Sequence, residues 1–204
     1  METPAVIGLR AHTGWAAAVA VAGEREAPRV VERRRIELAG AGLNRFVFHH
    51  AAELSAADAE RWIERARLAA ERHATDQMAA LVAAIRSLGQ RAIAAVVPAA
   101  APLPPLGAIV GAHAKIHAAE GVFWREVTAA ACIGVGLEVR RVGERAARDL
   151  LAALLPDGRP SLEARLRGLG AALGPPWAED QKLATVLAWT RLSHEAAALS
   201  VSSE

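Results

Sequence analysis

Residues 6–21 read VIGLRAHTGWAAAVAV, a pattern that predicts two short apolar strands running in opposite directions. The turn between them contains His12, Thr13 and Gly14, and the first strand ends at Arg10. Together these residues offer a guanidinium, an imidazole, a hydroxyl and turn amides, a set of groups that suits phosphate or carboxylate. We therefore expect Arg10, His12 and Thr13 to bind an anionic ligand.

Hydrophobic periodicity predicts the remaining elements. Ser55 begins a helical stripe of apolar residues that ends at Gly89, and residues 92–97 form a continuous apolar run typical of a strand buried on both faces. The other expected elements are strands at 29–38 and 137–142, an extended segment at 45–50, and helices at 106–133, 144–155, 161–173 and 179–196.

The order of these elements predicts an α/β fold. An antiparallel meander followed by right-handed strand–helix–strand crossovers gives a mixed five-stranded sheet of order 3-2-1-4-5 flanked by long helices. Residues 6–10 should be central and parallel to residues 92–97. We expect one domain over residues 1–196, followed by a flexible tail at 197–204.

From Val6 to about Leu192 the chain resembles the ribonuclease H-like superfamily, and within it the RuvC-like resolvases. The resemblance is carried by GLR at 8–10, TGWA at 13–16 and EDQKLA at 179–184. It implies acidic residues at the end of the first strand, the end of the fourth strand and the start of the last helix, where they hold two metal ions. Here the first place is Arg10, the second, around Val97, has no acid, and only Glu179 and Asp180 remain. We therefore expect a degenerate active site without nuclease chemistry.

A second candidate site lies in residues 112–121, AHAKIHAAEG, which are also similar to a segment of an uncharacterised family of bacterial proteins. On a helix His113, His117 and Glu120 share one face, and two imidazoles with a carboxylate could hold a divalent metal. The alternatives are another functional polar site, or polar residues that only bond to neighbouring elements. We expect all three to point inward to the carboxyl edge of the sheet, within reach of Arg10 or His12. At most one of His49 and His50 should join them, because neighbouring residues of an extended segment point to opposite faces.

Composition narrows the function classes. The chain has 204 residues, 24 Lys and Arg against 22 Asp and Glu, and a net charge of +2, which permits a phosphate-containing or nucleic-acid partner. The absence of Tyr disfavours a base-stacking platform, and the single cysteine, Cys132, excludes an internal disulfide and a multi-cysteine zinc site. The N-terminus lacks a basic region followed by the apolar core of a signal peptide, and no apolar run reaches the length of about 20 residues that a membrane span needs, so a cytoplasmic location is expected.

Three functions remain open from the sequence. The first is a non-catalytic binding or scaffold protein whose anionic ligand contacts Arg10, His12, Thr13, His113, His117 and Glu120. The second is a metal-dependent hydrolase or nuclease that uses His113, His117 and Glu120. The third is a homo-oligomeric structural protein that uses its long helices as the interface.

Overall fold

The computed structural model describes residues 2–201, with side chains up to residue 193, and these residues contain one five-stranded sheet. Its order is β3-β2-β1-β4-β5, as predicted. β1 pairs antiparallel with β2 and parallel with β4, where Ile7 lies opposite Ala95, which confirms the expected central pairing. The strands are β1 (Thr3–His12), β2 (Trp15–Gly23), β3 (Pro28–Glu37), β4 (Gln90–Pro98) and β5 (Glu138–Val142).

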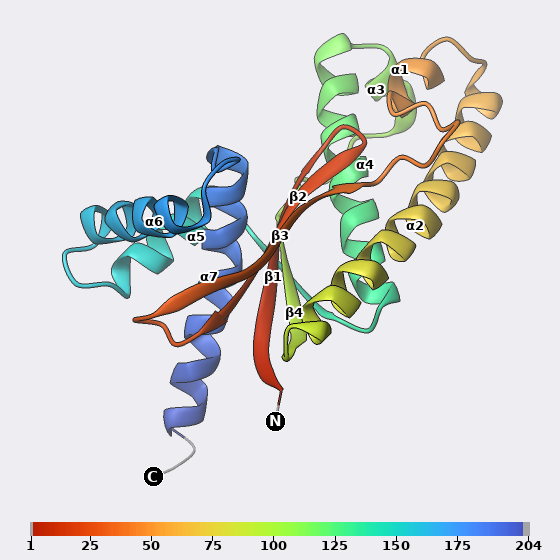
Figure 1. Ribbon diagram of the computed structural model, residues 1–204. Coiled ribbons are helices and arrows are strands. Elements are labelled where there is room, and N and C mark those ends of the chain that lie inside the picture. Colours follow the sequence, from red (N-terminus) through yellow and green to blue (C-terminus); the bar gives the residue numbers. More distant parts are fainter. Residues whose placement is uncertain (1, 202–204) are drawn as a thin grey trace.

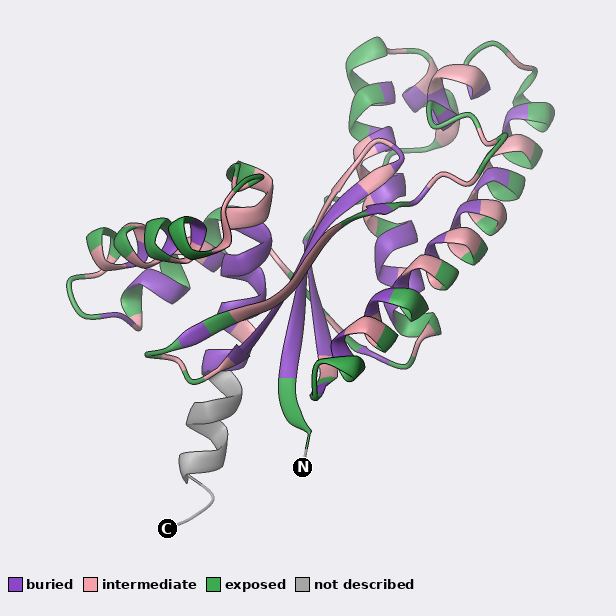
Figure 2. Ribbon diagram, in the orientation of Figure 1, coloured by how far each residue is buried: buried purple, intermediate pink, exposed green. Residues whose placement is uncertain are grey.

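Helices cover both faces of this sheet (Figure 1). One face carries α1 (Val47–Ala51), α2 (Ala56–Ser87), α3 (Leu106–Val110) and α4 (His113–Gly134). The other face carries α5 (Glu144–Ala153), α6 (Arg159–Leu173) and α7 (Glu179–Val201). The side of each helix layer that faces the sheet is buried and the outer side is exposed (Figure 2), so the sheet separates two hydrophobic cores.

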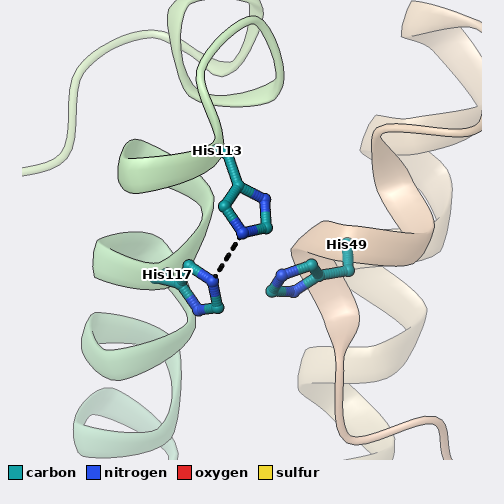
Figure 3. Close-up of side chains that lie close together, drawn as sticks. All are labelled: His49, His113 and His117. Atoms are coloured by element: carbon teal, nitrogen blue, oxygen red, sulfur yellow. Dashed lines mark hydrogen bonds between the residues drawn. The ribbon is translucent and has the colours of Figure 1, made fainter.

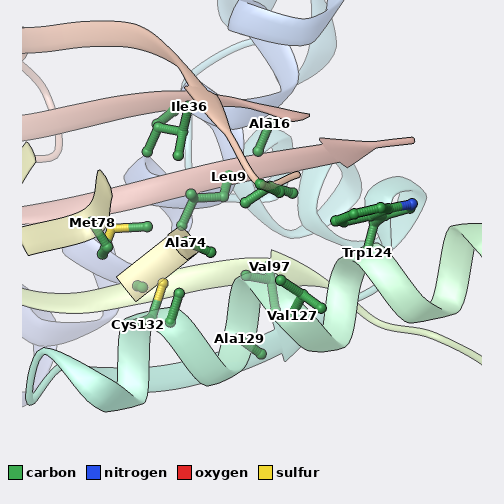
Figure 4. Packing of buried hydrophobic residues seen from close by; sticks show 14 of the residues in the cluster. Leu9, Ala16, Ile36, Ala74, Met78, Val97, Trp124, Val127, Ala129 and Cys132 are labelled. Carbon is green, nitrogen blue, oxygen red and sulfur yellow. The ribbon is translucent and has the colours of Figure 1, made fainter. Parts of the chain in front are cut away.

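Alternation along β1 determines which core each residue joins. Ile7 and Leu9 are fully buried against α2 and α4, and Figure 4 shows Leu9 in that core with Met78 and Trp124. Val6 is buried in the core with α7, and Gly8 lies against the α7 backbone. Arg10 and His12 continue the Val6–Gly8 side, so they lie on the α7 face of the sheet.

The expectation of an extended segment at 45–50 was wrong, because residues 47–51 form α1. A helix this short has few hydrogen bonds of its own, so its free N–H groups need other acceptors. The carboxylate of Glu120 on α4 accepts hydrogen bonds from the backbone N–H groups of Phe48 and His49. That acceptor is 72 residues away from Phe48, so no local pattern could reveal it.

The single helix expected at 106–133 is two helices, α3 and α4. α3 ends at Val110 and is followed by Gly111 and by Ala112, which is extended, with φ −148° and ψ 116°. The chain turns there, so His113 is the first residue of α4 and does not lie two turns inside a longer helix.

α7 continues to Val201, into the segment 197–204 that was expected to be a tail, and residues 202–204 lie outside the described part. Among the described residues, every helix is too short or too polar to cross a lipid bilayer.

Candidate functional site

The carboxyl ends of β1 and β5 meet the first turns of three helices at a hollow of about 480 Å³. Arg10 contributes from β1, Arg145 and Arg148 from α5, Arg159 from α6 and Glu179 from α7. Glu144 and Leu183 complete the lining. Helix N-termini carry partial positive charge, and the lining holds four arginines and two glutamates. Three further carboxylates, those of Asp149, Glu163 and Asp180, bond to the same arginines from outside the lining.

Asp180, in the first turn of α7, is bonded to two residues of β1. Its Oδ1 accepts from Arg10 Nη1 at 2.5 Å and lies 2.9 Å from His12 Nε2. All three side chains are about one quarter to one third exposed, at 26% for Arg10, 23% for Asp180 and 34% for His12. The carboxylate is therefore neutralised by groups of the chain itself.

The other acids around the hollow are also paired with arginines. Arg148, with a side chain only 18% exposed, contacts Glu163 at 3.3 Å and also bonds to Glu179. Arg10 Nε lies 3.8 Å from Glu144 Oε1. Both acids of the EDQKLA segment, Glu179 and Asp180, thus have arginine partners.

Thr13 is not part of this arrangement. It lines a separate hollow of about 450 Å³ beside the β1–β2 turn, together with Trp15, Arg35 and Arg45. The structure therefore brings Arg10 and His12 together, as expected, but it separates Thr13 from them.

His113 and His117 lie on α4, with their Nε2 atoms 2.9 Å apart. A third imidazole, His49 of α1, faces them in Figure 3, with ring centroids 5.6 Å from His113 and 4.8 Å from His117. One nitrogen from each of the three rings lies within 4.8 Å of the others. His50 points elsewhere, with its ring 4.7 Å from that of Trp62, so only one of the two adjacent histidines joins the cluster.

Glu120 is 3% exposed and lies behind this cluster. Its Oε1 accepts from the backbone N–H groups of Phe48 at 2.8 Å and His49 at 3.2 Å, and lies 3.2 Å from His49 Nδ1. The expected group of His113, His117 and Glu120 is replaced by three histidines, with Glu120 holding one of them.

Glu120 is buried, as expected, but the expectation that His113 and His117 point inward within reach of Arg10 or His12 was wrong. His113 and His117 are exposed, and they belong to the helix layer opposite α7. Arg10 and His12 face α7, because side chains alternate along β1 and α4 packs on the other face. The carboxyl edge therefore has two separate candidate sites, one on each face.

The sequence interpretation did not single out Arg145, Arg148 and Arg159, which line the hollow. A usable signal was present, since residues that follow the third parallel strand, expected at 137–142, must lie at the same edge as Arg10. It missed the role of His49 because α1 was assigned as extended.

The fold is similar to that of solved structures. The RuvC of Thermus thermophilus in complex with a Holliday junction substrate aligns with a TM-score of 0.52 at 12% identity, covering 95% of each chain. A second Thermus thermophilus RuvC structure has a TM-score of 0.50 at 13% identity, covering 95% of this chain and 96% of that one. No family model and no curated protein match the sequence. The chain therefore has a ribonuclease H-like fold, similar to that of RuvC from Thermus thermophilus.

Proposed function

We propose that this protein is a non-catalytic ribonuclease H-like protein that binds the phosphate backbone of a nucleic acid in the arginine-lined hollow. The observation that carries the proposal is the contact of Arg10 and His12 with Asp180. The likeness to a RuvC solved with a Holliday junction supports nucleic acid as the ligand class.

The positive charge of Arg10 opposes metal-dependent catalysis at Asp180. A two-metal nuclease holds its cations with carboxylates from several elements. In this chain the last turn-side positions of β1 on the α7 face are Arg10 and His12, and β4 ends with Val97 and Pro98. A cation at Asp180 would have to displace the Arg10 guanidinium and then remain next to its charge.

Phosphate binding is assigned to Arg145 and Arg159 at the rim of the hollow. Their ion pairs are exposed, and pairs of this kind contribute about 0–1 kcal/mol each. Arg145 has a side chain that is 93% exposed, and Arg159 one that is 53% exposed. Exchanging their carboxylate partners for phosphate oxygens therefore costs little, and a guanidinium binds phosphate through two parallel hydrogen bonds.

Binding is tested by fluorescence anisotropy with a labelled four-way junction and a duplex of equal length, in chelator and at several salt concentrations. We expect Arg145→Ala/Arg159→Ala to weaken binding. It should also reduce the slope of log affinity against log salt by about one for each phosphate that the variant no longer neutralises. The matched control is Arg61→Ala/Arg65→Ala, which removes the same charge from an exposed stretch of α2. Equal weakening by both double variants would show that the hollow is not the binding site.

Absence of catalysis is tested by incubating the same junction and an RNA–DNA hybrid with Mg²⁺ or Mn²⁺. We expect no cleavage. Cleavage that persists through repurification and disappears in Glu179→Ala/Asp180→Ala would overturn the non-catalytic function.

A further inference from the structure

We propose that His49, His113 and His117 bind one divalent transition-metal ion, Zn²⁺ in the first place, between α1 and α4. Glu120 is then a positioning residue that orients His49. This site lies on the face of the sheet opposite the arginine-lined hollow and does not depend on the proposed function. The hydrolase considered from the sequence would bind its metal through His113, His117 and Glu120. In the structure His49 takes the place of Glu120 as the third ligand.

The geometry suits a shared ion. Nitrogen ligands lie about 2.0–2.1 Å from zinc, so in a tetrahedral site they are about 3.4 Å from one another. The Nε2 atoms of His113 and His117 are 2.9 Å apart, and one nitrogen of each ring lies within 4.8 Å of the others. Coordination requires the His113 and His117 side chains to rotate until all three nitrogens have the tetrahedral spacing, and both side chains are exposed.

Glu120 prepares His49 for metal binding. Its Oε1 lies 3.2 Å from Nδ1 of His49 and accepts a hydrogen bond from it in the tautomer that carries the proton on Nδ1. That tautomer leaves the Nε2 lone pair available for a metal ion. Zinc-bound histidines commonly have such a carboxylate partner, which raises their basicity and fixes the ring orientation.

The burial of Glu120 independently supports a cation bound to His49. A carboxylate that is 3% exposed needs compensating positive charge, because burying an unpaired charge is costly. Among the described residues, His49 is its one ion-pair partner, and Oε2 is buried without a hydrogen-bond partner. A dication on His49 supplies the compensating charge.

The ligand set also selects the metal. Three imidazoles suit Zn²⁺, Ni²⁺, Cu²⁺ or Co²⁺, whereas Mg²⁺ and Ca²⁺ require oxygen ligands. Because His113 and His117 are exposed, the fourth coordination position faces solvent and can hold a water molecule.

The experiment titrates the tag-free full chain, stripped with a chelator, with Zn²⁺ in competition with a chromophoric chelator. A parallel titration follows the visible absorption of Co²⁺. We expect one equivalent to bind and Co²⁺ to show the intense bands of a tetrahedral site. His113→Ala should weaken binding at least about 100-fold, and Glu120→Gln about 10- to 100-fold, as for other carboxylates that support a metal-bound histidine.

His50→Ala is the matched control, because His50 is adjacent to His49 on α1 but contacts Trp62. We expect it to leave Zn²⁺ affinity unchanged. Folding is followed by thermal melts, in which Zn²⁺ should raise the Tm of the wild type and of His50→Ala but not that of His113→Ala. Binding below one equivalent, unchanged binding in His113→Ala, or equal weakening in His50→Ala and His113→Ala would each overturn the site.

Discussion

Gly8, in the middle of β1, lets the strand touch the backbone of α7. A Cβ built on this residue would overlap the carbonyl oxygen of Ala184. Helix backbone cannot move aside as a flexible side chain can. The glycine therefore sets the close approach of β1 to α7, which brings Arg10 within reach of Asp180.

Gly8→Ala should lower the free energy of unfolding by about 3 kcal/mol or more, at the upper end of the range for overpacking. Gly121→Ala is the control, because Gly121 lies inside α4 with no atom near the position of a Cβ. That change should stabilise the protein by about 0.5–1 kcal/mol, since alanine favours a helix over glycine. Urea denaturation measures both, and a Gly8→Ala variant as stable as the wild type would show that α7 does not pack this closely.

Cys132 is fully buried, and burial raises the pKa of its thiol from 9.0 to about 12. At pH 9 the native thiol is therefore protonated, whereas in an unfolded chain about half would be thiolate. We expect iodoacetamide to leave the native protein unmodified at pH 9 and to alkylate it fully in denaturant.

The same shift predicts a pH dependence of stability. The contribution of the neutral thiol is complete below pH 9 and decreases as the pH rises toward 12, because only the unfolded state ionises in that window. The stability difference between wild type and Cys132→Ala should therefore shrink above pH 9. Rapid alkylation of the native protein would contradict this account of the thiol.

At the scale of elements, Arg33 of β3 fastens the loop that leads into α7. Its guanidinium donates to the carbonyl oxygens of Leu173, Gly174, Pro175 and Pro176 at 2.5–3.1 Å. These four bonds hold the start of α7, and with it Asp180, against the sheet.

We expect Arg33→Gln to lower the free energy of unfolding by about 2–3 kcal/mol, because the change removes hydrogen bonds from a charged donor and leaves carbonyls unpaired. Arg35→Gln is the control, since Arg35 is half exposed and paired with Glu37. It should cost less than about 1 kcal/mol. Equal midpoints for the two variants in urea would contradict the role of Arg33.

At the scale of the whole molecule, the sheet separates the two sites. Arg10 and Asp180 belong to the α7 layer, whereas His49, His113 and His117 belong to the α1–α4 layer (Figures 1 and 3). The sites have no residue in common, and distant sites without shared partners contribute independently.

We therefore expect Zn²⁺ affinity to be unchanged in Arg145→Ala/Arg159→Ala, and junction affinity to be unchanged in His113→Ala. The combined variant should show the loss of Zn²⁺ affinity of His113→Ala and the loss of junction affinity of Arg145→Ala/Arg159→Ala, each within about 0.5 kcal/mol. A junction affinity that changes more than about twofold on adding one equivalent of Zn²⁺ would show that the two faces are coupled.

Much of the architecture could be predicted from local pattern. The two strands at 6–21, the buried strand at 92–97 and the long helix after Ser55 are each encoded by the spacing of their own apolar residues. Ser55 accepts a hydrogen bond from the backbone N–H of Asp58, as a helix cap should. The sheet order could also be predicted, because right-handed crossovers and short connections between consecutive elements leave few possible topologies.

The contacts between residues of the two candidate sites are determined by the packing of segments that lie far apart in the sequence. Arg10 and Asp180 are 170 residues apart, and His49 meets α4 only because Glu120 holds the first turn of α1. The period of a strand or helix shows which residues share a face, but not which element covers that face. Arg10 and His113 could thus each be chosen from the sequence, while their separation onto opposite faces depended on α7 packing against one side of β1 and α4 against the other.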